Sequence, residues 1–364
     1  MERQKNNSKS RHSYFLSLAF EQAKINLGST SKNPSVGCVI ERDGSIISSG
    51  HTSLNGRPHA EYNALNKRKN FKNSNLYVTL EPCSHYGVTP PCTNIIVKKK
   101  IKKVYYSLFD FDIRSKKKSK KILNKKKIIV KESLLQQDGL DFYKSYYLQH
   151  SSNLPLINAK IAVSKDYFTK NLKKKRITNL QSERRTHLLR SMHDCIISTS
   201  KSINDDDSLL NCRIDGLKNK SPHLFILDRN LKLKKKLKLF NIVKNRKTML
   251  FTCSNNRKKI SLLKRKGIKI IQINSLKNKN DFKKLFLILK KRGYSRIFVE
   301  SGLTFLNFLI KNKFLNNIYL FKSRNSLKKL GANYSSSNLI KKITLKNLIN
   351  VNLFEDNLYK EKLK

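Results

Sequence analysis

Short apolar runs that alternate with helical patterns constrain the fold of this chain more than any other feature of its sequence. In the second half, helical patterns separate several of these runs, most clearly from Asp281 to Arg292, where the apolar residues share one stripe and Gly293 follows. Strands that alternate with helices are typical of a mostly parallel, doubly wound sheet. We expect strands at 156–162, 195–198, 224–227, 249–252, 268–271, 296–299 and 318–321.

The first third of the chain mixes helical and strand patterns around one hairpin signal. Asp43-Gly44 separates an apolar run at 36–41 from a second one at 46–47, as a tight turn between antiparallel strands does. The expected order of helix, hairpin, helix, strand, helix and strand indicates an α/β sheet packed between helices. Helices are expected over 13–27, 59–65 and 92–99, and further strands over 76–80 and 104–108.

The length of 364 residues suggests two domains. A polar run from Gln149 to Asn153 precedes a fresh apolar strand, so we predict one domain over 1–150 and a second over 151–364. No run approaches the roughly 18 apolar residues of a membrane span, and the first residues lack the apolar core of a secretory signal. Six scattered cysteines are too few for a disulfide scaffold, so we expect a reducing, cytoplasmic location.

A formal net charge of +54 raises two interpretations. Dense lysine is typical of proteins that neutralise nucleic-acid phosphates. The lysines are spread along the whole chain, however, which favours a solvated compositional bias, and we therefore expect no nucleic-acid partner. The charge should still favour small anionic ligands such as phosphorylated metabolites.

The strongest chemical signal combines His59 and Glu61 with Cys83 and Cys92. A catalytic zinc site takes three protein ligands and keeps a fourth position for water, and one imidazole with two thiolates supplies such a set. Glu61 follows His59 by two residues in the same expected helical turn, where a carboxylate can move protons without ligating the metal. Zinc-dependent base and nucleoside deaminases carry a comparable H-x-E and P-C-x-x-C pattern. Here eight residues separate the two cysteines instead of two.

The strings at 33–40, 56–61 and 79–92 resemble the deaminase domain of the bifunctional riboflavin-biosynthesis deaminase/reductase family. The resemblance implies Zn²⁺ on His59, Cys83 and Cys92, with Glu61 as the proton shuttle. It also implies that Asn33 and the loop at 84–90 line a pyrimidine pocket. In that loop, His85 is expected to have a pocket or loop role, with a fourth metal ligand as the alternative.

The segment after the strand at 104–108 departs from the family pattern. The family has Asp-Pro-x-Pro and then a glycine pair, whereas this chain keeps Asp110 but continues with Arg114 and a run of lysines. These basic residues are an alternative source of charge on the phosphate side of the deaminase pocket.

The second half lacks the G-x-G-x-x-G pattern of common dinucleotide-binding folds. Its resemblance to the reductase domain of the same family implies a dihydrofolate-reductase-like α/β fold that uses NADPH. The resemblance places substrate contacts at Arg190, Leu210, Arg213 and Glu300. It places cofactor contacts at Val163, Arg176, Ser202, Asp206, Arg229 and Gly302.

Three replacements distinguish this half from the family: Tyr167 stands for a glycine, Arg176 for a tryptophan, and Lys174 lies where a substrate-binding serine is expected. Because of these replacements, the alternative remains that the protein has deaminase activity alone and that its reductase domain has decayed. The resemblance otherwise implies deamination of 2,5-diamino-6-(5-phosphoribosylamino)pyrimidin-4-one and then NADPH reduction to 5-amino-6-(5-phosphoribitylamino)uracil. A nucleic-acid base deaminase is the rival enzyme class, and a homo-oligomer formed through the reductase domain is left open.

Overall fold

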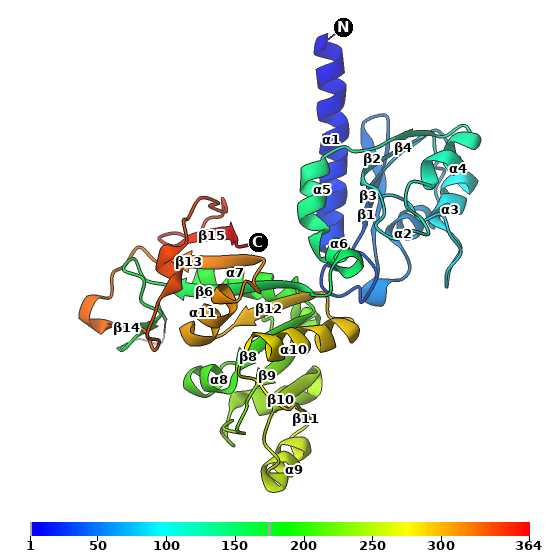
Figure 1. Ribbon diagram of the computed structural model, residues 1–364. Helices are drawn as coiled ribbons and strands as arrows, with labels where there is room; N and C mark the ends of the chain where they lie inside the picture. The colour runs from blue at the N-terminus through cyan, green and yellow to red at the C-terminus, as the bar shows by residue number, and fades with distance from the viewer. Residues whose placement is uncertain (1, 174–175) are drawn as a thin grey trace. The chain divides into compact units, whose positions relative to one another are not determined.

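The computed structural model describes residues 2–173 and 176–364 of the chain, which divides into two compact units, Met1–Asn153 and Leu154–Lys364 (Figure 1). Lys174, one of the replacements named above, lies outside the described residues. Within the part of the chain that is described, no helix is both long enough and apolar enough to cross a membrane.

A five-stranded sheet in the order β2-β1-β3-β4-β5 forms the centre of the first unit. β1 pairs antiparallel with β2 and β3, whereas β4 lies parallel to both β3 and β5. Asp43 and Gly44 join β1 to β2 with φ values of 51° and 88°, which confirms the predicted hairpin turn. The strands are β1 (Gly37–Arg42), β2 (Ser45–His51), β3 (Asn75–Leu80), β4 (Lys103–Leu108) and β5 (Ile129–Lys131).

Two glycines let helices pack closely on opposite faces of this sheet. A Cβ atom on Gly37 would lie 1.9 Å from a backbone atom of α1, and one on Gly50 would lie 2.5 Å from backbone atoms of α2. Gly50 pairs with Cys38, the neighbour of Gly37, so the two glycines face opposite sides of the sheet. The predicted sheet between helices is therefore confirmed (Figure 1). The helices are α1 (Glu2–Lys24), α2 (Ala60–Leu65), α3 (Cys92–Lys98), α4 (Ser119–Lys125), α5 (Gln136–Phe142) and α6 (Lys144–Ser151).

The second unit contains an eight-stranded sheet in the order β11-β10-β9-β8-β12-β6-β13-β15. Every neighbouring pair in it is parallel except β13 and β15, which confirms the predicted mostly parallel sheet. Its strands are β6 (Leu156–Val163), β8 (Cys195–Thr199), β9 (His223–Leu227), β10 (Thr248–Thr252), β11 (Lys269–Gln272), β12 (Arg296–Glu300), β13 (Asn317–Lys322) and β15 (Asn357–Lys362), and β7 (Lys170–Asn171) pairs separately with β14 (Gly331–Ala332).

Helices connect most of the parallel strands of this unit. The predicted helix over 281–292 forms as α10 and begins at a capping box made by Asn278 and Asp281. Its apolar stripe is buried, and Gly293 follows the helix with a φ of 92°. The helices are α7 (Leu180–Ser191), α8 (Ser200–Asp206), α9 (Arg257–Arg265), α10 (Lys279–Lys291) and α11 (Leu303–Lys311).

Four adjacent parallel strands, β9, β8, β12 and β6, end at the same edge of the large sheet. In open α/β sheets, ligands bind outside the carboxyl ends of the strands. This edge is therefore where the second unit is built to hold a ligand.

Candidate active sites

Three donor residues suited to zinc meet where two short helices of the first unit begin. His59 directly precedes α2, Cys92 is the first residue of α3, and Cys83 lies in the loop after β3. Their ligand atoms all lie within 4.8 Å of one another. The fold thus brings together three residues that the sequence separates by up to 33 positions.

The spacing of these atoms fits a zinc ion. The Nδ1 atom of His59 lies 3.6 Å from Sγ of Cys83 and 3.4 Å from Sγ of Cys92. Zinc bonds of about 2.3 Å to sulfur and about 2.1 Å to nitrogen, at a tetrahedral angle, place such atoms about 3.6 Å apart. Hydrogen bonds from Cys92 and from His59 also lower the pKa of the Cys83 thiol, which favours the thiolate that metals bind.

Glu61 lies beside these donors, in the first turn of α2, and only 4% of it is exposed. Its carboxyl group is hydrogen-bonded to Cys92. Burial, and then the negative charge of Cys83, raise the pKa of Glu61 to about 7. A cation at the three donors would lower this pKa again, because opposite charge favours the carboxylate. A titratable carboxyl therefore adjoins the donors without being one of them.

Asn33 supports the segment that leads into His59. Its Nδ2 atom donates to the carbonyl oxygen of Gly56 at 2.8 Å. Gly56 has a φ of 91°, and a Cβ atom there would lie 2.7 Å from the Asn33 side chain, so the position requires glycine. Asn33 is thus held in place by the segment that leads to His59, and its predicted contact with a pyrimidine stays a prediction.

The loop between Cys83 and Cys92 is anchored at its first turn by Ser115, a fully buried residue. The hydroxyl of Ser115 accepts from the backbone N–H of Ser84 at 3.2 Å and lies 2.7 Å from Nδ1 of His85. With Nδ1 engaged by Ser115, His85 fits the predicted pocket or loop role better than the alternative of a metal ligand. The cluster of donor atoms among the described residues does not include it.

Glu81 is a buried carboxylate that the sequence reasoning missed. It accepts hydrogen bonds from the backbone N–H groups of Asp110, Lys117 and Ser119, at 3.1, 2.9 and 3.1 Å. It therefore ties the segment that departs from the family pattern to the end of β3, two residues before Cys83. A carboxylate directly after an apolar strand, next to Pro82, was the available signal.

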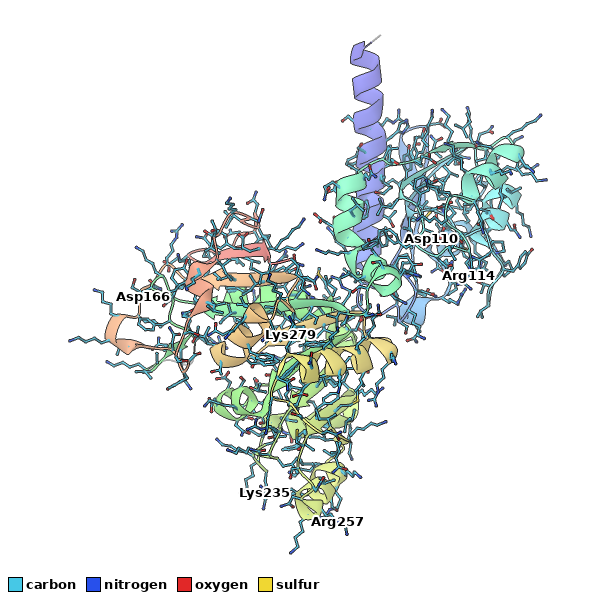
Figure 2. All side chains as sticks on the ribbon, viewed as in Figure 1. Asp110, Arg114, Asp166, Lys235, Arg257 and Lys279 are labelled. Carbon is cyan, nitrogen blue, oxygen red and sulfur yellow. The ribbon has the colours of Figure 1, made fainter. Side chains whose placement is uncertain are left out.

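Asp110 and Arg114 lie on that segment and differ in environment (Figure 2). Asp110 is buried and accepts from the hydroxyl of Tyr146 at 2.9 Å, and burial raises its pKa to about 6. Arg114 is exposed, and its guanidinium group pairs with both carboxylate oxygens of Asp112. The charge of Arg114 is therefore already neutralised.

In the second unit, Arg190 and Glu300 form a buried bidentate ion pair. Nε of Arg190 donates to Oε1 of Glu300 at 2.6 Å, and Nη2 donates to Oε2 at 2.9 Å. The remaining nitrogen of Arg190 donates to the carbonyl oxygen of Asn211 at 3.0 Å. The two predicted substrate residues thus contact each other across the sheet edge, and the predicted contact of Arg190 with a substrate phosphate stays a prediction.

Lys160 is a second residue that the sequence reasoning missed. It lies opposite Glu300 in the register of β6 and β12. Burial lowers the pKa of Lys160, whereas the charge of Glu300 raises it. A single lysine inside a largely apolar strand was the signal, and the strand register places it beside the predicted contact residue Glu300.

Arg213 and Arg176 meet at Glu183 on α7. Arg213 donates to Oε1 of Glu183 at 2.9 Å, and Arg176 lies 2.9 Å from Oε2. Arg176 was expected on the cofactor side, yet the structure places it beside Arg213, an expected substrate residue. Leu210, the remaining predicted substrate residue, precedes Arg213 in the chain; it is buried and has a φ of 50°.

Four of the predicted cofactor residues, Val163, Ser202, Arg229 and Gly302, lie at or just after the strand ends on the shared edge of the sheet. Val163 ends β6, Arg229 follows β9, and Asp206 ends α8, the helix after β8. Gly302 precedes α11, and its N–H donates to the hydroxyl of Ser202 at 2.9 Å. The turn after β8 and the turn after β12 therefore lie side by side, which is an arrangement suited to a phosphate-bearing cofactor.

Tyr167 has a φ of 66°, the region where the family glycine would carry no steric cost. Its hydroxyl accepts from Nζ of Lys322 at 3.2 Å, and its ring packs against the apolar core of the second unit. The Tyr167 side chain is thus partly buried against the core of the second unit.

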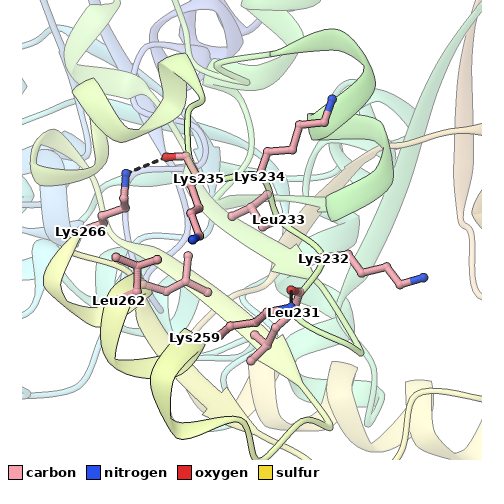
Figure 3. A pocket seen from close by; sticks show the side chains of 9 residues that line it. Leu231, Lys232, Leu233, Lys234, Lys235, Lys259, Leu262 and Lys266 are labelled. Atoms are coloured by element: carbon pink, nitrogen blue, oxygen red, sulfur yellow. Dashed lines mark hydrogen bonds between the residues drawn. The ribbon is translucent and has the colours of Figure 1, made fainter.

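A separate cavity of about 190 Å³ lies between α9 and the chain after β9 (Figure 3). Leucines and lysines line it, and two of the lysines, Lys259 and Lys266, donate from their ammonium groups to the carbonyl oxygens of Leu231 and Lys235. None of the predicted site residues lines it. The cavity therefore plays no part in the two sites.

Comparison with known proteins decides the family. Residues 9–108 match the family described as cytidine and deoxycytidylate deaminase zinc-binding region, and residues 155–323 match the RibD C-terminal domain. A riboflavin biosynthesis protein RibD from Aquifex aeolicus is 30% identical over 310 residues, which cover 84% of this chain and 85% of the relative. The chain belongs to the RibD family.

Two further comparisons cover most of the chain and its first domain. The structure of Acinetobacter baumannii RibD, form 1, aligns with a TM-score of 0.79 at 25% identity, over 97% of this chain and 98% of that one. A diaminohydroxyphosphoribosylamino-pyrimidine deaminase from Buchnera aphidicola is 36% identical over 143 residues, which cover 39% of this chain and 97% of the relative.

As a RibD protein, the chain is a bifunctional deaminase and reductase of riboflavin biosynthesis. Zinc is the cofactor of its deaminase domain, and NADPH is that of its reductase domain. The expected fold class, with a deaminase-like domain followed by a RibD reductase domain, is confirmed.

Proposed function

We propose that residues 1–150 deaminate 2,5-diamino-6-(5-phosphoribosylamino)pyrimidin-4-one. We propose further that residues 151–364 reduce the ribosyl group of the product with NADPH, to give 5-amino-6-(5-phosphoribitylamino)uracil. The observation that carries the proposal is the meeting of His59, Cys83 and Cys92 with Glu61 beside them. The name of the Buchnera aphidicola relative supports the choice of substrate.

In the deaminase domain, His59, Cys83 and Cys92 hold the metal. Zinc bound there supplies Lewis-acid activation of water. Glu61 accepts a proton from the attacking water and delivers it to the amine that leaves as ammonia. Asn33 and the loop at 84–90 bind the pyrimidine ring, and Gly56 and Ser115 hold these two elements in place.

In the reductase domain, NADPH supplies the hydride. We assign the substrate phosphate to Arg190 and Arg213, as the family resemblance implies, with Arg190 positioned by Glu300 and Asn211 and Arg213 positioned by Glu183. Glu300 and Asp206 lie at the hydride-transfer site. The other contacts are Leu210 on the substrate side and Val163, Ser202, Arg229 and Gly302 on the cofactor side. Arg176 is assigned to the cofactor on the family resemblance alone, since it pairs with Glu183 beside Arg213.

The protein is proposed to work in the cytoplasm on a phosphorylated pyrimidine and to bind no nucleic acid. Self-association, where it occurs, is assigned to the reductase domain. The spread of lysine along the chain supports a solvated surface over a nucleic-acid interface.

The test uses the full-length protein loaded with zinc. Ammonia release from the phosphorylated pyrimidine reports deamination, and the loss of NADPH absorbance after that reaction reports reduction. We expect ammonia release without NADPH and NADPH consumption only after deamination. Ammonia release from cytidine or from single-stranded nucleic acid, with none from the phosphorylated pyrimidine, would contradict the proposal.

A further inference from the structure

A guanidinium group lies at the rim of the deaminase site and has no role in the proposed mechanism. Arg57 precedes the metal donor His59 by two residues. Its Nη1 atom reaches across to the loop between Cys83 and Cys92 and donates to the hydroxyl of Thr89 at 2.6 Å. Its Nη2 atom lies 3.7 Å from the position that a Cβ atom on Gly87 would occupy. Arg57 therefore bridges two of the segments that surround the donors.

Within the described part of the chain, no carboxylate neutralises the charge of Arg57. Among the side chains that the structure describes, no Asp or Glu oxygen lies within 4.0 Å of its guanidinium nitrogens. Arg114, the other arginine near this site, pairs with Asp112. Arg57 is thus the arginine of this site whose charge is available to an anion.

A second group faces the same place. Nε2 of His85 lies 3.9 Å from the same Cβ position on Gly87, while Ser115 holds the ring through Nδ1. A Cβ atom at position 87 would lie at ordinary contact distance from both groups, so Arg57 and His85 flank Gly87. The flanking residues Tyr86 and Val88 are 74% and 85% exposed, so the place opens to solvent.

We propose that Arg57 binds the phosphate group of the deaminase substrate and makes this domain selective for the phosphorylated form. The inference rests on the proposed function, which supplies a substrate with one phosphate. A phosphate at the rim leaves the ring to reach the metal donors, and a guanidinium group is the side chain best suited to hold it. The segment after β4 then needs no cation for this purpose.

The test compares the Arg57→Gln, Arg57→Lys and Arg42→Gln variants of the full-length, zinc-loaded protein. Arg42 is a matched control, because it is a half-buried arginine of the same domain whose Nη1 atom donates to a neutral acceptor, the carbonyl oxygen of Asn70. Deamination is measured with the phosphorylated pyrimidine and with the same compound after removal of its phosphate. Zinc content reports correct folding of the deaminase domain, and reductase activity on deaminated substrate reports that of the second unit.

Arg57→Gln should raise KM for the phosphorylated substrate roughly 10- to 100-fold with little change in kcat, since one charge-assisted contact is lost. KM for the dephosphorylated compound should stay within about twofold of the wild type, and Arg57→Lys should recover part of the loss. Equal losses with both compounds, or a loss as small as that of Arg42→Gln, would overturn the assignment. A wild type that releases no ammonia from the phosphorylated substrate would instead contradict the proposed function, and with it the basis of this inference.

Discussion

The buried pair of Arg190 and Glu300 offers a sharp test of how the reductase site is held together. Glu300→Gln keeps the size of the side chain and removes its charge. Both side chains are nearly buried, with exposed fractions of 11% and 9%. We therefore expect loss of the Glu300 charge to destabilise the sheet edge and the substrate site together.

The magnitude follows from the contacts. The glutamine amide can accept one of the two hydrogen bonds from Arg190 but turns a donor toward the other nitrogen. One charge-assisted bond is worth about 1.5–3 kcal/mol, and breaking a buried ion pair costs about 3–5 kcal/mol. Because the carbonyl oxygen of Asn211 still accepts from Arg190, we expect the lower end of this range, about 3 kcal/mol.

Hydrogen exchange followed by mass spectrometry is the suitable assay. The chain has no tryptophan and two separate units, so a global fluorescence signal would not report this site. A loss of about 3 kcal/mol should speed exchange in peptides covering β12 and α7 by about 100-fold. Asp215→Asn is the control, because its ion pair with Lys218 is exposed and should contribute little.

The pH dependence adds a second check. Burial by itself raises the pKa of Glu300, but the charge and hydrogen bonds of Arg190 bring it below the ordinary value of 4.5. A carboxylate with a lowered pKa stabilises the fold above its unfolded-state pKa, and the stabilisation is lost as pH falls through the folded-state value. The difference between wild type and Glu300→Gln should therefore be full at pH 7 and shrink below about pH 4.5. A variant that exchanges as slowly as Asp215→Asn at pH 7 would refute the reasoning.

Three further predictions concern the two sites. Cys83→Ser should lose bound zinc, measured by metal analysis, whereas Cys253→Ser should retain about one zinc per chain; unchanged zinc in Cys83→Ser would exclude Cys83 as a ligand. Glu61→Gln should retain zinc but slow ammonia release by at least about 10²-fold, while reduction of deaminated substrate stays nearly unchanged. Full deamination activity in this variant would exclude Glu61 as the acid/base. Asp206→Asn should lower the kcat of NADPH oxidation more than it raises KM, and a pure KM effect would place Asp206 in binding alone.

The strands and the helix order follow from local patterns in the sequence. The parallel strands are buried on both faces and therefore read as short apolar runs, which made β6, β8, β9 and β12 predictable. The zinc donors were predictable for another reason, since His59, Cys83 and Cys92 are chemically distinctive and occur with Glu61 in a recognisable spacing. Neither inference needs knowledge of which segments touch.

The chain from Asp110 to Asn153 was less predictable. Many lysines interrupt the apolar pattern of α4 and β5, and no short motif occurs in the segment, so these two elements were not predicted. What fixes it is the carboxylate of Glu81, which accepts three backbone hydrogen bonds from residues 29 to 38 positions later in the chain. A sequence pattern does not encode such long-range partners.

The partners of the site residues were decided only by the tertiary structure. Strand register places Lys160 opposite Glu300, and helix α7 brings Arg190 onto the same carboxylate across 110 positions of sequence. In the first unit, the fold turns Arg57 toward Thr89, and no carboxylate among the described side chains pairs with it, whereas Arg114 is neutralised by Asp112 two residues away. The sequence by itself determines which charges the chain carries and which segments form its strands. Whether a given charge is paired or available depends on which groups the fold makes neighbours, because ion pairs form between groups that are close in space.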